Sequence, residues 1–214
     1  IRETCAAAGI DIAMITSCGA PTGIYLAILD ETGEMVAAVN DMRATDMFTV
    51  AHLDARSTTL ATADMLVADC NIPTACLAWL CEFAAERAIP LVIEPVSVPK
   101  ARKLLDFKRP APVFCITPNR QQVEALTGQA GIMPGLEALH RQGFSNVVAH
   151  CGSEGAFISD GIQPPVRIPS FSVSNVADVT GAGDAAVAGL VCGLATGHDL
   201  ASSARLGQAS AAIK

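Results

Sequence analysis

Short apolar runs alternate with longer segments of helical periodicity over the middle of the chain. The runs at residues 65–69, 90–93, 113–117 and 146–149 have the length and composition of buried strands. Apolar residues at helical spacing predict helices at residues 51–63, 72–88, 98–105, 120–126, 136–142, 181–194 and 200–214. Strands and helices that alternate in this way form parallel βαβ units. We therefore expect an α/β protein of three layers, with a mostly parallel central sheet flanked by helices.

The first part of the chain has a different pattern. A helix is predicted at residues 1–8, and strands are predicted at residues 11–16, 24–29 and 34–40. The last two strands flank Asp30-Glu31-Thr32-Gly33, a hairpin signal with glycine late in the loop. This section is therefore expected to be antiparallel.

The change of pattern suggests a division of the chain. We expect a small antiparallel unit at residues 17–45 and an α/β core made of residues 1–16 and 46–214. Because the chain begins and stops within predicted helices, we also expect this core to be truncated at both ends.

The composition is that of a folded protein that handles small molecules. Hydrophobic residues make up 51% and charged residues 16%, which argues against a disordered chain. The formal charge is −7 without a Lys/Arg cluster, so we expect no nucleic-acid partner. No apolar run approaches the roughly 20 residues that span a bilayer, and we expect neither a signal peptide nor a membrane partner. The 8 cysteines include no C-x-x-C pair, which predicts reduced, buried thiols in a cytoplasmic protein.

The strongest chemical signal is the run Asp178-Val-Thr-Gly-Ala-Gly-Asp184-Ala-Ala186. Its small residues leave room for a ligand, and the helix that follows offers free N–H groups and the positive end of its dipole. These features suit phosphate oxygens. Asp184 beside such a site is either a residue that favours the helix start or a base that takes the proton of an attacking hydroxyl.

Other interpretations of this loop remain. It has the form of an ordinary turn with a capping Asp. Gly181-Ala-Gly183-x-x-Ala186 also matches the dinucleotide fingerprint G-x-G-x-x-A, although that motif normally opens the first βαβ unit. A Walker loop is excluded, since it needs a Gly-Lys pair and the sequence has none.

At this loop the sequence resembles the PfkB, or ribokinase-like, family of carbohydrate kinases. Residues 178–190 are similar to the family's C-terminal signature, with Val179 in place of the usual Thr, Ser or Pro. Thr117-Pro118-Asn119, followed by Glu124, resembles its Asn-x-x-Glu segment, and Gly152-Ser-Glu-Gly155 resembles its G-x-x-G nucleotide loop. The resemblance covers nearly the whole chain. It implies a ribokinase-like fold in which the small antiparallel unit is a β lid.

The resemblance implies an ATP-dependent kinase with an alcohol acceptor. Asp184 would be the general base, and Gly181, Ala182 and Gly183 would form the anion hole. Asn119 would lie near the ATP phosphates. The nucleotide site would be lined by His150, Cys151, Gly152, Ser153, Glu154 and Gly155.

The same resemblance implies Mg²⁺ and a monovalent cation such as K⁺. Asp178 and Thr180 match positions that bind the monovalent cation in many members. One departure concerns Mg²⁺, because the Glu of Asn-x-x-Glu would stand at position 122, where this chain has Gln122. A neutral amide is a poorer partner for a hard cation. Either ATP holds Mg²⁺ largely by itself, or activity is reduced.

Within the family the resemblance is closest to the pseudouridine kinases. Residues 21–30 and 39–42 look like their lid hairpin, and residues 69–73 and 94–100 look like their substrate-side strand ends. This implies pseudouridine or a related nucleoside or sugar as acceptor, with ribose as an alternative. The substrate-binding residues would be Asn71, Asn40, Asp41 and Asp184.

Several of these side chains have an alternative without a ligand. Asn40, Asp41 and Glu94 are equally well explained as exposed polar residues. Lys100 and Arg102 are expected to be solvated, with contact to a substrate phosphate as the alternative. A catalytically weak nucleotide-binding or regulatory protein on the same fold, and a dinucleotide oxidoreductase, remain as alternative functions. Lids of this family often pair between subunits, so a homodimer is expected.

Overall fold

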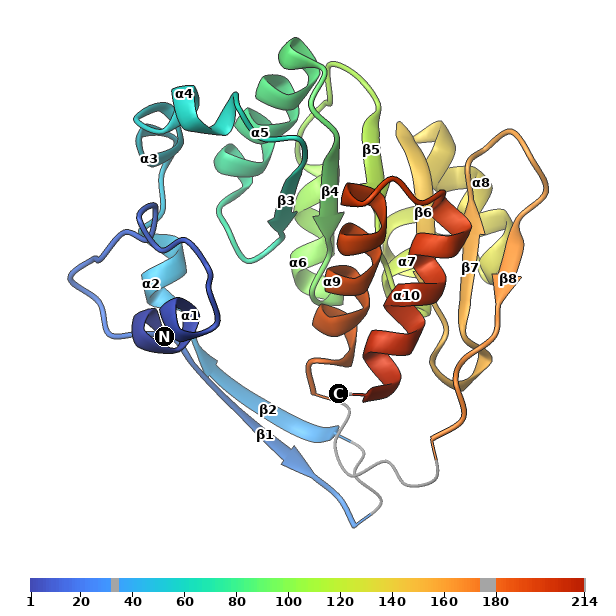
Figure 1. Ribbon diagram of the computed structural model, residues 1–214. Coiled ribbons are helices and arrows are strands. Elements are labelled where there is room, and N and C mark those ends of the chain that lie inside the picture. The colour runs from blue at the N-terminus through green and yellow to red at the C-terminus, as the bar shows by residue number, and fades with distance from the viewer. Residues whose placement is uncertain (32–34, 174–179, 214) are drawn as a thin grey trace.

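The chain forms one large and one small β-sheet (Figure 1). The computed structural model describes residues 1–31, 35–173 and 180–213. The small sheet pairs β1 (Ile24–Leu29) and β2 (Met35–Asp41) antiparallel. The large sheet has the order β3-β4-β5-β6-β7-β8. Its strands are β3 (Leu66–Asp69), β4 (Leu91–Glu94), β5 (Val113–Ile116), β6 (Phe144–His150), β7 (Ala156–Ser159) and β8 (Val166–Ile168).

The pairing of β3 with β4, β4 with β5 and β5 with β6 is parallel, and β7 and β8 continue the sheet antiparallel. The expected α/β fold with a mostly parallel sheet and a separate antiparallel pair is therefore confirmed. The parallel strands and the helices between them follow from the alternation of apolar runs in the sequence.

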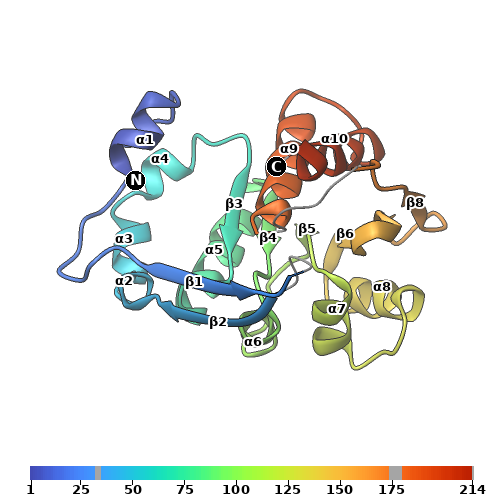
Figure 2. The same cartoon turned by 90° about the horizontal axis from the view of Figure 1, so that it is seen from below.

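Helices cover both faces of the large sheet (Figure 2). One face carries α9 (Ala182–Ala195) and α10 (Leu200–Ile213). The other face carries α5 (Thr74–Arg87), α6 (Val98–Ala101) with the 3₁₀-helix η1 (Arg102–Leu105), α7 (Arg120–Thr127) and α8 (Ile132–Arg141). The short helices α1 (Arg2–Ala7) and α2 (Arg43–Asp46) lie near one end of the small sheet, whereas α3 (Val50–Asp54) and α4 (Ser57–Leu60) lie on the side of α5 (Figure 1). The 3₁₀-helix η2 (Gly152–Glu154) links β6 to β7.

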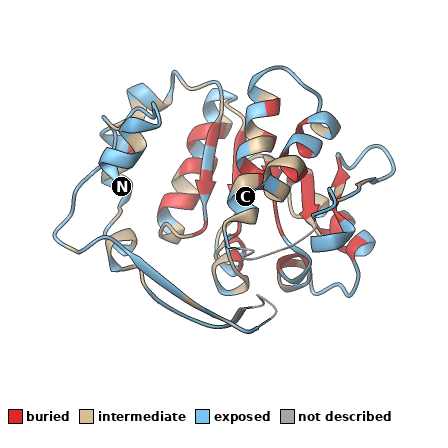
Figure 3. Cartoon of the chain, turned by 60° about the horizontal axis from the view of Figure 1, so that its bottom comes forward, coloured by how far each residue is buried: buried red, intermediate tan, exposed pale blue. Residues whose placement is uncertain are grey.

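The core lies on both faces of the large sheet. Val92 and Cys115 pack in the cluster that includes Leu190 of α9, whereas their neighbours Ile93 and Ile116 pack in the cluster on the opposite face. Figure 3 shows the buried residues gathered in this sheet and the helices against it, while β1 and β2 are largely exposed. Successive residues of a strand face opposite sides of the sheet, and helices cover both sides. Residues on both faces of a central strand are therefore buried, which explains the continuous apolar runs.

Three of the differences between the predicted and the observed elements have a clear local cause. The strand predicted at residues 11–16 is wrong, because the Asp11 carboxylate accepts a hydrogen bond from Ala13 N at 2.9 Å and the chain turns there. The helix predicted at residues 51–63 is divided into α3 and α4, because Arg56 N donates to Leu53 O at 2.9 Å and tightens the chain. The helix predicted from residue 136 begins at Ile132, because a proline is tolerated in a first helical turn.

The described part of the chain contains no helix with the length and apolar character needed to cross a bilayer. The lid boundaries at residues 17 and 45 stay a prediction.

Candidate active site

The start of α9 is an open turn at the edge where β3 and β4 end (Figure 1). Gly181 precedes the helix with φ 82°, a left-handed conformation that suits glycine. The first helical hydrogen bond runs from Ala185 N to Gly181 O at 2.9 Å, so the N–H groups of Ala182, Gly183 and Asp184 have no partner within the helix. This turn therefore has the donors and the dipole of an anion-binding site.

Asp184 lies in the first turn of α9 and is exposed. A Cβ added to Gly183 would meet nothing within 4 Å, so the turn is not packed against the core. The predicted base and anion hole are thus accessible, as a reacting site requires. Thr180, one of the two predicted cation ligands, directly precedes Gly181 and is exposed. Asp178, the other, lies outside the described residues.

Glu94 ends β4 beside Asp69 of β3, to which it is matched in register. Its carboxylate accepts hydrogen bonds from Thr117 Oγ1 and, at 3.0 Å, from Val96 N. Burial raises the pKa of Glu94 to about 7, and the nearby carboxylates of Asp184 and Asp69 act in the same direction against the two hydrogen bonds. The Asp184 carboxylate in the α9 turn therefore lies close enough to the end of β4 to disfavour the charged form of Glu94.

The turn after Glu94 is strained. Val96 has φ 68°, although it is β-branched, and Ser97 N donates to Pro95 O at 2.8 Å around it. This γ-turn points the Val96 N–H back at the Glu94 carboxylate. Strain of this kind gathers at functional sites, where surrounding contacts maintain it.

We expect Glu94→Gln to change how stability depends on pH. Between pH 4.5, near the pKa of an unperturbed Glu, and about pH 7, folded Glu94 keeps a proton that the unfolded chain has released. Wild-type stability therefore loses this contribution as pH rises through that window, whereas glutamine does not titrate. The melting temperature of the variant relative to wild type should rise by a few degrees between pH 4.5 and 8.

Thermal unfolding at several pH values measures this difference. Burial lowers the pKa of His150 to about 4, so protonation of His150 makes stability increase as pH rises. This contribution is the same in the variant and the wild type, and it cancels in the difference between their melting temperatures. A melting-temperature difference between variant and wild type that stays constant from pH 4.5 to 8 would contradict the raised pKa of Glu94.

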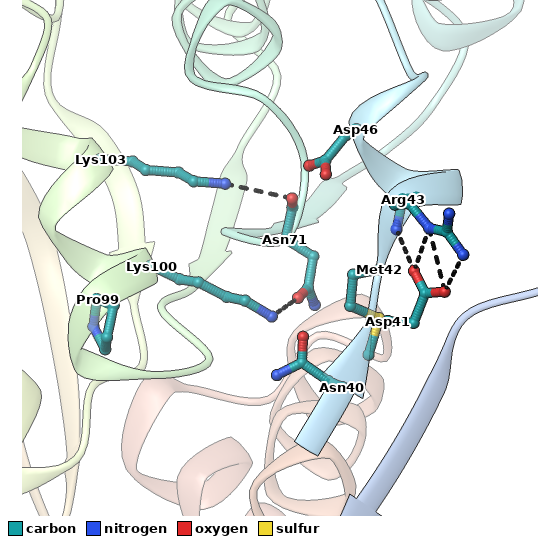
Figure 4. A pocket seen from close by; sticks show the side chains of 9 residues that line it. All are labelled: Asn40, Asp41, Met42, Arg43, Asp46, Asn71, Pro99, Lys100 and Lys103. Atoms are coloured by element: carbon teal, nitrogen blue, oxygen red, sulfur yellow. Dashed lines mark hydrogen bonds and ion pairs between the residues drawn. The ribbon is translucent and has the colours of Figure 1, made fainter. Parts of the chain in front are cut away.

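A pocket of about 430 Å³ opens between the end of the small sheet and the end of β3 (Figure 4). It brings together three predicted substrate-binding residues, Asn40 and Asp41 from the lid and Asn71 from the β3–α5 turn. Arg43 holds Asp41 at 2.6 Å, and the hydrogen bonds from its side chain and backbone lower the pKa of Asp41 to about 2. Asn40 and Asn71 therefore line one cavity, although they lie 31 residues apart in the chain.

Three charged side chains of this pocket were not expected there from the sequence: Arg43, Asp46 and Lys103. Lys100, which ends the segment expected on the substrate side, also lines it. Lys100 donates to Asn71 Oδ1 and is half-buried, so its charge is only partly solvated, while Arg102 is exposed as expected. The spacing of Lys100 and Lys103 could have indicated their place at the pocket, because it puts both on one side of a helical turn that follows a buried strand.

The predicted nucleotide residues meet where β6 ends. His150 N donates to Pro118 O at 2.8 Å, and Asn119 forms a parallel bridge with His150. The G-x-x-G segment, with Gly152, Ser153 and Glu154 exposed and Cys151 partly buried, follows as η2. Glu154 pairs with Arg120 at 2.8 Å, which ties the start of α7 to this segment.

Gln122 has a clear local role. Its N–H donates to Asn119 Oδ1 at 2.9 Å, and its Oε1 accepts from Asn119 N at 2.7 Å. This reciprocal capping box starts α7, and Gln122 is 2% exposed. A glutamate would make the same bond to Asn119 N, so Gln122 keeps the local geometry and removes only the negative charge.

The ring of His150 packs against α10. Its Nδ1 lies 3.1 Å from Gln208 Nε2, and its Nε2 is buried without a partner among the described residues. Burial lowers the pKa of His150 to about 4, so the ring is neutral at pH 7. The contact fastens α10 to the predicted nucleotide edge, and direct contact of His150 with ATP stays a prediction.

The chain is similar to known proteins over most of its length. The model of the pfkB family carbohydrate kinases matches residues 1–214. The pseudouridine kinase of Escherichia coli K12 is 34% identical over 200 residues, which cover 89% of this chain and 61% of that protein. The chain thus spans about three fifths of the length of this relative.

Solved structures agree in fold. A carbohydrate kinase from Agrobacterium tumefaciens has a TM-score of 0.79 and 29% identity over 99% of this chain and 68% of its own. The ribokinase of Arabidopsis thaliana, complexed with ribose and ATP, has a TM-score of 0.69 and 18% identity over 90% of this chain and 62% of its own, which shows the shared fold. With the family model matched from end to end, this chain belongs to the pfkB family of carbohydrate kinases.

Proposed function

We propose that this chain carries the active site of an ATP-dependent kinase that phosphorylates a hydroxyl of pseudouridine or a related nucleoside or sugar. The observation that carries the proposal is the exposed Asp184 in the open first turn of α9, at the edge where β3 and β4 end. Ligands of parallel α/β sheets bind beyond the carboxyl ends of the strands.

Asp184 takes the proton of the acceptor hydroxyl as its oxygen attacks the γ-phosphorus of ATP. The new bond joins that oxygen to phosphorus, and the bond to the β-phosphate oxygen breaks to release ADP. The N–H groups of Ala182, Gly183 and Asp184, with Gly181 shaping the turn, hold the phosphoryl oxygens. Positioning and charge stabilisation account for most catalysis in reactions of this class.

The choice of acceptor rests on two supports. The relative with 34% identity is a pseudouridine kinase, and the pocket that contains Asn40, Asp41 and Asn71 offers polar groups for a hydroxyl-rich molecule. ATP as donor is supported by the family and by the ribokinase of similar fold, which is complexed with ATP. Ribose or another sugar is the alternative acceptor.

We propose Mg²⁺ as the companion of ATP. Within residues 1–31, 35–173 and 180–213, no group of three His, Cys, Asp or Glu side chains is placed to hold a metal ion, and Gln122 is neutral. Mg²⁺ would therefore be held chiefly by the phosphates, with its other positions filled by water. K⁺ at Asp178 and Thr180 belongs to the same proposal.

We also propose a homodimer that forms through the lid, in a cytoplasmic protein. Large apolar side chains of the small sheet are more than half exposed: Ile24, Leu26, Ile28, Val36 and Val39. An exposed two-stranded sheet with such side chains is unstable unless it is covered. Light scattering that gives the mass of a single chain at micromolar concentration would contradict the dimer. The cytoplasmic location is supported by the free cysteines, of which Cys70, Cys76, Cys81 and Cys115 are buried.

The function is tested by ADP release from the protein with ATP, Mg²⁺ and a panel that contains pseudouridine, uridine, adenosine and ribose. We expect acceptor-dependent turnover that is highest with pseudouridine. No turnover with any acceptor, together with retained ATP binding, would favour the catalytically weak nucleotide-binding protein, for which Gln122 is the motivating observation. Turnover highest with ribose would reassign the acceptor and leave the kinase in place.

A further inference from the structure

The side-chain amide of Asn71 is fixed in one orientation (Figure 4). Asp69 accepts hydrogen bonds from Asn71 N at 2.9 Å and from Asn71 Nδ2 at 2.7 Å. On the other side, Lys100 Nζ donates to Asn71 Oδ1. A carboxylate only accepts and an ammonium only donates, so the amide cannot flip without losing both contacts.

Lys103 holds the turn that carries Asn71. Its Nζ donates to three backbone carbonyls, those of Cys70 at 3.0 Å, Asn71 at 3.3 Å and Ile72 at 3.0 Å. An ammonium has three N–H donors, so these carbonyls use all of them. Lys103 therefore shapes the turn and has no donor left for a ligand.

Lys100 differs from Lys103 in what it has left to offer. Among the residues that the structure describes, Asn71 alone accepts a hydrogen bond from Lys100, and the Lys100 side chain lines the 430 Å³ pocket together with Asn40. Figure 4 shows the Lys100 ammonium directed to the space between Asn71 and Asn40. Its remaining donors are therefore available to a molecule in the pocket.

The charges around the pocket indicate a neutral molecule. Arg43 is paired with Asp41, so these two residues together add no net charge to the pocket. The positive charges of Lys100 and Lys103 are matched by two acids, Asp46 in the pocket and Asp69 behind Asn71. A pocket with balanced charge suits hydroxyl and carbonyl oxygens better than a phosphorylated acceptor.

We propose that Lys100 is a specificity-determining residue that donates a hydrogen bond to an oxygen of a neutral acceptor, and that Lys103 is the positioning residue that holds Asn71 and Lys100 in place. The inference rests on the proposed function, because the acceptor is the substrate of that reaction. Its test uses binding without ATP, so it does not depend on turnover.

The experiment is calorimetric titration of the protein with pseudouridine, with pseudouridine 5′-phosphate and, separately, with ATP. The variants are Lys100→Met, Lys100→Arg and Lys103→Met, and Arg102→Gln is the matched control, because Arg102 is an exposed cation on the same segment. We expect Lys100→Met and Lys103→Met to weaken nucleoside binding about tenfold or more, since each removes charged hydrogen bonds. Lys100→Arg should recover part of the loss, and Arg102→Gln should bind like wild type.

A loss confined to the nucleoside, with ATP affinity within about twofold of wild type, separates this role from general structural damage. Unchanged nucleoside binding in Lys100→Met, tighter binding of the 5′-phosphate than of the nucleoside, or a parallel loss of ATP affinity would overturn the inference. So would a wild-type protein that binds no member of the acceptor panel. ADP release by wild type judges the proposed function separately, since a protein without turnover can still show the Lys100-dependent binding.

Discussion

Asp184→Asn is expected to lower kcat for phosphoryl transfer about 10²–10⁴-fold while ATP binding stays close to wild type. Asparagine has nearly the same shape as aspartate but cannot take a proton from the acceptor hydroxyl. The donors of the α9 turn are backbone N–H groups, and the substitution does not alter them. The loss should therefore appear in turnover and not in the affinity for ATP. Single-turnover kinetics with a radiolabelled γ-phosphate, combined with ATP titration, measures both quantities.

The control for this variant is Asp64→Asn. Asp64 is also exposed, but it precedes β3 and so lies at the opposite edge of the parallel sheet. We expect its kcat to equal that of wild type. Wild-type turnover in Asp184→Asn would remove the base from the mechanism and with it the main support for the kinase proposal. A protein that lost ATP affinity as strongly as kcat would instead indicate that Asp184 acts in binding.

The sequence predicts where the α9 turn lies because the residues that form the turn are neighbours in the chain. Gly181, Gly183 and Asp184 are neighbours in the chain, so the open turn and the acid at the helix start follow from the order of residues alone. The alternation of strands and helices can also be predicted from the sequence, because each buried strand is one continuous apolar run. The one strand predicted wrongly, at residues 11–16, depends on pairing with another strand, which the local pattern does not contain.

The lysine contacts are the opposite case. Lys103 reaches the carbonyls of Cys70 and Ile72, which lie more than 30 residues earlier in the chain. Only the adjacency of β3 and β4 in the sheet brings the segments that follow them together. Charge and spacing identify Lys100 and Lys103 as a pair on a helical turn, but they do not show which side is covered. The raised pKa of Glu94 has the same origin, since it depends on burial among Asp69, Thr117 and Asp184 from three other segments.

Gly155→Ala is expected to destabilise the protein by about 3 kcal/mol or more. Gly155 has φ 89° and ψ −135°, a conformation essentially restricted to glycine. A Cβ there would lie 2.0 Å from Ile168 O and 2.7 Å from Pro169 C, both backbone atoms at the end of β8. Backbone atoms cannot rotate aside as a side chain does, so β8 must separate from the start of β7.

Gly152→Ala in the same loop is the matched control. Gly152 also has a positive φ, 59°, but a Cβ there would meet nothing within 4 Å. Its cost is that of one left-handed alanine, about 1 kcal/mol. Urea unfolding of the two variants therefore separates the close approach of β8 from simple backbone strain. If both lose the same free energy of unfolding, the contact between Gly155 and the end of β8 does not hold this loop. If Gly155→Ala alone is strongly destabilised, the shape of the predicted nucleotide loop is set by β8, and residues 152–154 remain free to be tested for ATP contact by substitutions that leave the fold intact.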